Sequence, residues 1–204
     1  MNWTRRGILG LGGLSVIAVA AARCTDPRQI SEAAGATTPL PVLEVLSAGP
    51  APSLEPASGW LNSVPLTPSE LAGKVVLYDF WTFGCINCRR TLPAVKAWHA
   101  RYADDGLVVA SIHTPEFGYE ADVANVEEFV ADEGIEYPIA LDPDKTIWRA
   151  FANHYWPAFY LYDRDGRWRY HHIGEGAYPT TEDAIRQLLG VDAGSPRADH
   201  DLPG

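Results

Sequence analysis

The sequence predicts an α/β protein in which a central mixed β-sheet carries helices on both faces. From Trp60 onward, short apolar runs alternate with amphipathic stretches, and this alternation is typical of strands and helices that pack as layers. A chain of 204 residues is long enough to bury one proper core and hardly two. We therefore expect a single folded domain over residues 59–190.

Local patterns predict the individual elements. The run from Val75 to Trp81 is apolar and rich in residues that favour strands, so a strand is expected over 74–81. The dipeptide Asp165-Gly166 marks a turn between two later strands. The other expected elements are helices over 85–102, 123–132, 145–153 and 182–189, and strands over 107–113, 158–162 and 167–173.

The N-terminus has the form of an export signal. Two adjacent arginines, Arg5 and Arg6, precede a stretch without charge that runs to Ala22, and the pair resembles a twin-arginine signal. The apolar stretch is shorter than the ~20 residues that span a bilayer, so we expect cleavage at the alanines that end it. The alternative is that 1–23 is a short membrane anchor. Either way the sequence predicts an extracytoplasmic protein, in the periplasm or on the outer face of the cell membrane.

Two further segments are expected to lie outside the folded domain. Residues 24–58 are rich in Ala, Pro, Ser and Thr and have little apolar periodicity, which favours a linker. Cys24, at its start, is interpreted as incidental. Residues 191–204 are expected to form a disordered tail.

Charge and cysteine content limit the classes of function. The formal net charge is −10, so nucleic acid is excluded as a partner, and the membrane is a partner only through the N-terminal segment. Three cysteines are too few for the disulfide scaffold of a small secreted protein. Two of them form a Cys-x-x-Cys pair, which points to chemistry.

Cys85-Ile86-Asn87-Cys88 follows a buried strand after a three-residue loop and opens a predicted helix. Residues three apart on the first turn face the same side at ~5 to 6 Å between Cβ atoms, close enough for a disulfide after a small adjustment. Unpaired helix N–H groups beside Cys85 favour its thiolate. We therefore expect Cys85 to be the attacking nucleophile and Cys88 the thiol that resolves the mixed disulfide.

Asp79 and three aromatic-proline bonds are also candidate functional features. Asp79 interrupts an apolar strand, where a carboxylate is unfavourable unless it is paired or functional. Placed under the active-site helix, it would have a raised pKa and accept the Cys88 proton; the alternative is a polar residue at a sheet edge. Of the aromatic-proline bonds, Trp156-Pro157 directly precedes a strong strand, which would leave the Trp156 backbone free to pair with a substrate segment. The prolines of the other two bonds, Pro138 and Pro179, are interpreted as ordinary loop residues.

With these residues in place, the chain resembles the TlpA-like, redoxin-type branch of the thioredoxin superfamily over about 59–189. It is especially similar to the extracytoplasmic thioredoxin-like domain of DipZ-type proteins. The resemblance is carried by Trp60-Leu61-Asn62 with 71–77, by Phe80-Trp81-Thr82-Phe83-Gly84 running into the Cys-x-x-Cys pair, by His113-Thr114-Pro115-Glu116-Phe117, and by Gly174-Glu175-Gly176.

This resemblance implies a thioredoxin-like three-layer sandwich and a thiol:disulfide oxidoreductase that acts on protein disulfides. It implies an opening hairpin that contains Trp60, a redox disulfide between Cys85 and Cys88, Asp79 as the buried acid and Pro157 as the cis-proline. A stretch around 114–150 would be the insertion typical of the branch. Further candidates are Trp81 and Trp156 for substrate binding, and Glu116 and Glu175 without an assigned step.

Two departures from the family pattern limit what the resemblance implies. Thr91 occupies the position where TlpA-like reductases often have a glutamate, so no role of that carboxylate is carried over. DipZ-type proteins have a membrane electron-conducting domain on the same chain, whereas this sequence has only a short apolar segment. A separate membrane donor of the CcdA or DsbD type is therefore expected to supply electrons, and the favoured direction is reduction of the substrate.

Two alternative functions and one structural alternative remain open. A thiol peroxidase is suggested by Thr82, three residues before Cys85, although Tyr78 stands where a proline is expected. Cu(I) delivery would use both cysteines with a histidine such as His113, a residue that more often packs in a core. A zinc half-site is disfavoured because the one cysteine besides this pair is Cys24, which lies in or beside the predicted export signal. We expect no metal and no other cofactor.

Overall fold

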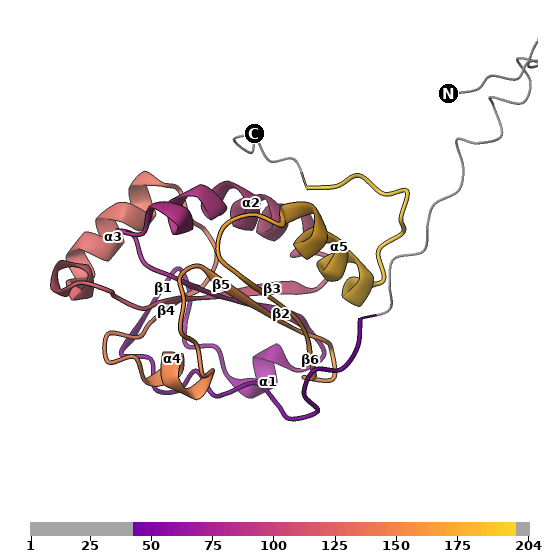
Figure 1. Cartoon of the computed structure of the whole chain (residues 1–204), viewed down its shortest axis with the longest axis horizontal. Coiled ribbons are helices and arrows are strands. Elements are labelled where there is room, and N and C mark those ends of the chain that lie inside the picture. Colours follow the sequence, from indigo (N-terminus) through magenta and orange to yellow (C-terminus); the bar gives the residue numbers. More distant parts are fainter. Residues whose placement is uncertain (1–42, 199–204) are drawn as a thin grey trace, which may run out of the picture. The chain divides into compact units, whose positions relative to one another are not determined.

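The computed structural model describes residues 43–198. The predicted export signal, Cys24 and the first part of the predicted linker lie outside these residues. Within them, a six-stranded sheet has the order β1-β4-β3-β2-β5-β6, and helices cover both of its faces (Figure 1). The predicted three-layer α/β sandwich with a mixed sheet is therefore confirmed.

Parallel and antiparallel strands both contribute to the sheet. β2 pairs in parallel with β3, and β3 in parallel with β4. β1 is antiparallel to β4, β5 to β2, and β6 to β5. The strands are β1 (Gly59–Leu61), β2 (Val75–Trp81), β3 (Leu107–His113), β4 (Ile139–Leu141), β5 (Ala158–Tyr162) and β6 (Trp168–Ile173).

Alternation along the central strand β2 creates two cores, one on each face of the sheet. Leu77 and Trp81 face the layer of α2, α3 and α5. Tyr78 and Phe80 face the opposite layer, which contains α1 and α4. The helices are α1 (Pro68–Leu71), α2 (Ile86–Tyr102), the 3₁₀ helix η3 (Gly118–Ala121), α3 (Val123–Asp132), α4 (Thr146–Ala150) and α5 (Tyr178–Leu189). Across residues 43–198, none of the helices has both the length and the apolar character needed to span a bilayer.

Several predicted elements need correction. The predicted opening hairpin is wrong, because the strand around Trp60 pairs with β4 and not with β2. The sequence pattern did not predict β4, which has three residues. Helix α5 begins at Tyr178, four residues before the predicted start. Pro179 therefore belongs to its first turn, where the missing N–H has no intrahelical partner to lose.

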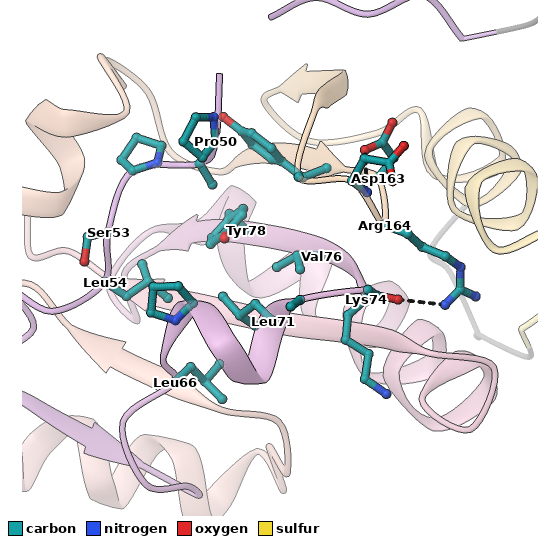
Figure 2. Close-up of a pocket in the computed structure, with 18 residues that line it drawn as sticks. Pro50, Ser53, Leu54, Leu66, Leu71, Lys74, Val76, Tyr78, Asp163 and Arg164 are labelled. Carbon is teal, nitrogen blue, oxygen red and sulfur yellow. Dashed lines mark hydrogen bonds between the residues drawn. The ribbon is translucent and has the colours of Figure 1, made fainter. Parts of the chain in front are cut away.

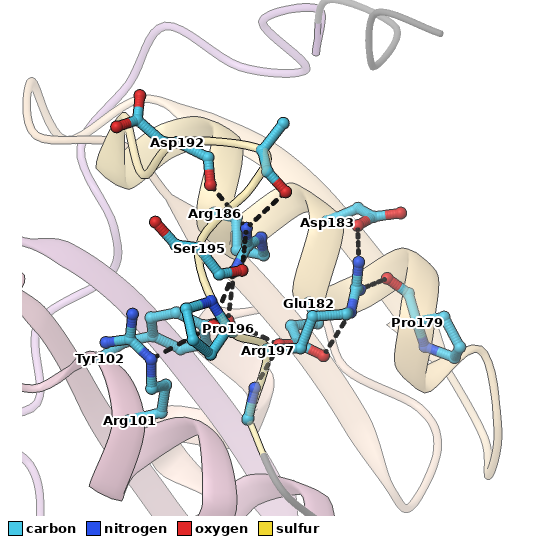
Figure 3. Close-up of polar contacts among 12 residues, drawn as sticks. Arg101, Tyr102, Pro179, Glu182, Asp183, Arg186, Asp192, Ser195, Pro196 and Arg197 are labelled. Carbon is cyan, nitrogen blue, oxygen red and sulfur yellow. Dashed lines mark hydrogen bonds and ion pairs between the residues drawn. The ribbon is translucent and has the colours of Figure 1, made fainter. Parts of the chain in front are cut away.

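The segment after α5 is held by two buried charged residues, so the prediction of a disordered tail is wrong for 191–198. Arg186 donates hydrogen bonds to the backbone carbonyls of Asp192, Ala193, Ser195 and Pro196 (Figure 3). The backbone N–H of Ala198 donates to Glu182 Oε1 at 2.7 Å. Buried polar groups of this kind are stable only when they are paired, so these contacts fix the course of the segment.

The second half of the predicted linker is also packed. Leu54 is buried in the core beneath α1 and α4, and Leu46 and Ser47 exchange backbone hydrogen bonds with Trp168. A cavity of about 250 Å³ lies between this segment, α1 and the turn from β5 to β6 (Figure 2). Its walls include Val76 and Tyr78, so it opens on the face of the sheet opposite α2.

Candidate active site

The Cys-x-x-Cys pair lies where β2 passes into α2. The strand ends at Trp81, a short loop follows, and Cys85 is the N-cap residue of the helix. The Cys85 Sγ accepts a hydrogen bond from the backbone N–H of Cys88, with a distance of 3.3 Å. Both residues are free thiols in this structure. The sulfur of Cys85 thus takes the place that a capping oxygen holds in other helices.

The two thiols have opposite electrostatic environments. Cys85 is half-buried, and its hydrogen bonds, first to the Cys88 thiol and then to the backbone N–H groups of Cys88 and Asn87, lower its pKa to about 7. Cys88 is 0% exposed, and desolvation is the main cause that raises its pKa above the ordinary value, with the Cys85 sulfur second. At neutral pH one thiol is therefore ready to attack while its neighbour keeps its proton.

Asp79 lies in the middle of the sheet and not at an edge. It pairs with Ser111 in β3 and with Phe159 in β5, and it is 1% exposed. Desolvation raises its pKa to about 7, and the hydrogen bond that the Ser111 Oγ donates at 3.2 Å opposes this rise. The Asp79 charge is also one of the causes that raise the pKa of Cys88. The carboxyl group and the buried thiol therefore share one environment.

Replacing Asp79 by asparagine is expected to stabilise the fold at alkaline pH. The pKa of Asp79 lies near 7 in the folded state and near 3.9 in the unfolded state. Between these two pH values the folded state keeps a proton that the unfolded state has lost, so the free energy of unfolding falls as the pH rises from the lower value to the higher one. Asparagine cannot ionise. Urea unfolding should give Asp79→Asn a free energy of unfolding about 2 to 4 kcal/mol above the parent at pH 8, and a smaller excess at pH 5. An excess that is the same at both pH values would contradict a carboxyl group that titrates near 7.

The start of β5 lies beside the end of β2. Ala158 pairs with Phe80, so Pro157 lies next to Trp81, at the end of the sheet where the Cys85 loop begins. The Trp156-Pro157 peptide bond is cis. The Trp156 indole N–H donates to the carbonyl oxygen of Thr114 at 2.9 Å, and its ring packs on Trp148 with centroids 4.1 Å apart. Trp156 is half-buried, which leaves part of it at the surface.

The two tryptophans predicted to bind substrate differ in exposure. Trp81 is 1% exposed, and its ring is surrounded by His113 and Phe129. It stabilises the core under α2 and presents no surface to a docked chain, so the prediction of substrate contact is wrong for Trp81. The reason is its register in β2, because it falls on the face that α2 and α3 cover.

The two glutamates without an assigned step lie in different surroundings. Glu116, in the loop after β3, is close enough to Cys85 for its charge to oppose the lowering of the Cys85 pKa. Glu175 forms an ion pair with Arg90 on the exposed side of α2, with a distance of 3.3 Å between charged atoms. The structure therefore brings Glu116 toward the reactive thiol and gives Glu175 a partner on the helix.

Sequence reasoning missed the buried carboxylate of Glu120. It lies in η3, is 0% exposed, and accepts hydrogen bonds from three backbone N–H groups. Next to it, His113 is buried, and desolvation lowers its pKa to about 4 although the Glu120 charge opposes this. The imidazole is therefore neutral at physiological pH, and its ring packs between Trp81 and Phe83. The expectation that His113 packs in the core is confirmed.

The fold and the thiol pair together define a class: thioredoxin-like proteins of the thiol–disulfide oxidoreductase type. Comparison with known proteins agrees. The AhpC/TSA family matches residues 49–171, which is more than half of the chain, and the chain belongs to this family. The predicted membership of the redoxin branch of the thioredoxin superfamily is therefore confirmed.

Individual relatives support the same class. The chain is 47% identical to Protein DipZ of Mycobacterium tuberculosis over 146 residues, which are 70% of this chain and 21% of DipZ. It thus spans about a fifth of the length of that relative. It is 31% identical over 141 residues to the thiol-disulfide oxidoreductase YkuV of Bacillus subtilis, covering 69% of this chain and 94% of YkuV. The solution structure of a thioredoxin-like protein in the oxidised form superposes with a TM-score of 0.64 at 31% identity, covering 69% of this chain and 95% of that one.

Proposed function

We propose that this protein reduces disulfide bonds in extracytoplasmic proteins by dithiol–disulfide exchange at Cys85 and Cys88. The observation that carries the proposal is the contrast between the two thiols. Cys85 caps α2 with a pKa lowered to about 7, and Cys88 is buried and protonated one helical turn away. In a pair arranged in this way, the first sulfur attacks the substrate disulfide and the second resolves the mixed disulfide that forms.

The exchange takes place in two steps. The Cys85 thiolate attacks one sulfur of the substrate disulfide, which breaks that bond, forms a mixed disulfide and releases the first substrate thiolate. Cys88 then gives its proton to the Asp79 carboxylate and attacks the Cys85 sulfur, releasing the second substrate thiolate. The substrate gains two electrons, and the enzyme is left with a Cys85–Cys88 disulfide. The shared buried environment of Asp79 and Cys88 supports this route for the proton.

Substrate is proposed to bind beside the Trp156-Pro157 bond. In the described part of the chain, the backbone of Trp156 forms no hydrogen bond to other backbone groups, and Pro157 lies at the end of the sheet from which the Cys85 loop departs. An extended segment that carries the disulfide would pair with this backbone as an added strand. Trp156 and Pro157 are therefore proposed as substrate-binding residues.

Reduction of insulin is the direct assay for this function. Fully reduced protein should cleave the disulfides of insulin and become oxidised in the same molar amount, because each turnover moves two electrons. Turnover should continue only when a reductant returns the Cys85–Cys88 pair to its thiol form. Absence of stoichiometric cleavage by the reduced protein would refute the proposal. In the cell, a membrane donor of the CcdA or DsbD type is proposed to supply these electrons.

Export through the twin-arginine pathway is proposed for the precursor. The support is the sequence around Arg5 and Arg6. Exchanging both for lysine keeps the charge and removes the recognised pair, so a double Arg5→Lys, Arg6→Lys variant should remain inside the cell. Fractionation followed by immunoblotting measures this. Unchanged export of the double variant would instead assign the precursor to the general secretory route.

A thiol peroxidase is the second candidate, because AhpC/TSA is the matching family and Thr82 precedes Cys85 by three residues. Tyr78 in place of the expected proline argues against it. Peroxide turnover with a regenerating dithiol separates the two activities. Cu(I) delivery through the same cysteines is separated by Cu(I) titration against a thiol-blocked control.

A further inference from the structure

One buried carboxylate joins two loops at the edge of the candidate active site. Glu120 Oε1 accepts the backbone N–H of Gly84 at 3.0 Å. Glu120 Oε2 accepts the backbone N–H groups of Glu116 at 2.6 Å and Phe117 at 2.9 Å. Buried backbone N–H groups that lose such a partner destabilise the structure, so the three bonds fix the two loops relative to each other.

The first of these loops leads directly into the nucleophile. Gly84 is the residue before Cys85, and Cys85 caps α2 through its sulfur. The position of the cap is therefore set on one side by the helix and on the other by the bond between Gly84 and Glu120. Movement of Gly84 is transmitted to the Cys85 sulfur, because the two residues are joined by one peptide bond.

The second loop carries aromatic side chains and the charge that faces Cys85. Tyr119 and Phe117 are exposed, with ring centroids 6.0 Å apart, and Tyr119 also contacts Phe83 in the loop before Cys85. Glu116 is the acidic group that acts on the Cys85 pKa. A shift of this loop would therefore alter both the surface around the nucleophile and the charge that faces it.

Gly84 leaves the room that Glu120 needs. A Cβ at this position would lie 2.1 Å from Glu120 Oε1 and 2.6 Å from the Tyr119 hydroxyl, closer than atoms of these kinds approach. The φ angle of Gly84 lies outside the left-handed region. The requirement for glycine thus comes from the approach of the carboxylate and not from the backbone conformation.

We propose that Glu120 is a positioning residue for Cys85, which holds the loop at Gly84 and the loop at Glu116 in the geometry that keeps the Cys85 sulfur capped by the Cys88 N–H. This inference rests on the proposed function only in taking Cys85 as the nucleophile. Glu120 acts through Gly84, and it takes no part in the transfer of electrons or protons.

The test measures the Cys85 pKa directly in the full-length reduced protein. The rate at which iodoacetamide alkylates Cys85 is followed against pH in Glu120→Gln. Glutamine keeps the size of the side chain but cannot accept hydrogen bonds from all three N–H groups. A rise of one unit from about 7 lowers the thiolate fraction at pH 7 from ~50% to ~9%, so alkylation at pH 7 should be about 5-fold slower. A folded variant with the parental Cys85 pKa would overturn the proposal.

Glu182→Gln is the matched control. Glu182 is also buried and also accepts a backbone N–H, that of Ala198. Its carboxylate accepts a hydrogen bond from the Tyr102 hydroxyl (Figure 3). Tyr102 is the last residue of α2, at the opposite end of that helix from Cys85. Loss of a buried carboxylate should destabilise this variant as well, but its Cys85 pKa should equal that of the parent. An equal pKa change in both variants would show a general loosening of the fold and would overturn the proposal.

Gly84→Ala disrupts the contact between Gly84 and Glu120 by changing the other partner, and it tests the proposal if Glu120→Gln does not fold. The added methyl displaces the carboxylate from Gly84, so the Cys85 pKa should rise here too, while an unchanged value would overturn the proposal. Alkylation needs no disulfide substrate, so its result is independent of the insulin assay. A protein that shows the expected pKa changes and does not reduce insulin would support the role of Glu120 and refute the proposed function.

Discussion

Replacing Cys88 by serine is expected to convert the protein into a trap for its substrates. Cys85 still caps the helix and attacks, but the serine hydroxyl cannot displace the substrate from the Cys85 sulfur. Mixed disulfides should therefore accumulate, and steady-state reduction of insulin should fall by at least about 100-fold. Non-reducing electrophoresis followed by mass spectrometry of the adducts measures this.

The Cys85→Ser, Cys88→Ser double variant is the control for the trap, and it should form no adduct. Adducts that survive in the double variant, or a Cys88→Ser protein that accumulates none, would contradict the assigned order of the cysteines. The structure of a trapped adduct would also test the substrate site, since the trapped segment should pair with the backbone of Trp156.

Asp79→Asn should slow the resolving step more than the first attack, if its carboxyl group accepts the Cys88 proton.

Replacing Cys85 by serine is expected to abolish reduction altogether. The other thiol of the pair, Cys88, is 0% exposed and its pKa is raised, so it neither reaches a substrate disulfide nor forms a thiolate at neutral pH. The rate of insulin reduction should fall by at least roughly 1,000-fold, to the uncatalysed level. Far-ultraviolet circular dichroism should be unchanged, because serine is nearly the same size and can also cap a helix.

Cys24→Ser provides the matched control for this loss of activity, because it removes a thiol from the same chain and leaves Cys85 and Cys88 unchanged. Its activity should equal that of the parent. Reduction of insulin by Cys85→Ser at more than a few per cent of the parental rate would show that another group begins the exchange.

Elements with a strong local pattern were predicted almost to the residue. The expected strand over 107–113 and helix over 123–132 agree with β3 and α3, because their apolar periodicity is decided within the element. Cys85 and Cys88 were likewise predicted as a pair at a helix N-terminus, since a strand, a short loop and a helix around a Cys-x-x-Cys motif are all local features. Burial of Asp79 followed from the apolar residues on either side of it.

The features that sequence reasoning missed depend on contacts between distant segments. β4 has three residues and is a strand only because β1 and β3 lie on its two sides. The segment 191–198 is packed because Arg186 binds its carbonyl groups, which no periodicity can indicate. Glu120 is 36 residues from Gly84 in the sequence, and a single glutamate in a loop is usually solvated. Its burial becomes visible only when the two loops are placed together.

The central claim is that Cys85 and Cys88 form a two-electron redox pair, and equilibration with glutathione tests it most directly. Protein held at a series of ratios of reduced to oxidised glutathione is quenched with acid, alkylated and analysed by mass spectrometry. The claim predicts one transition with the dependence of a two-electron couple, an oxidised form that carries two alkyl groups fewer than the reduced form, and a single disulfide that joins the Cys85 and Cys88 peptides. A stable glutathione adduct on Cys85 with Cys88 still free, or oxidation of Cys85 without a bond to Cys88, would contradict it.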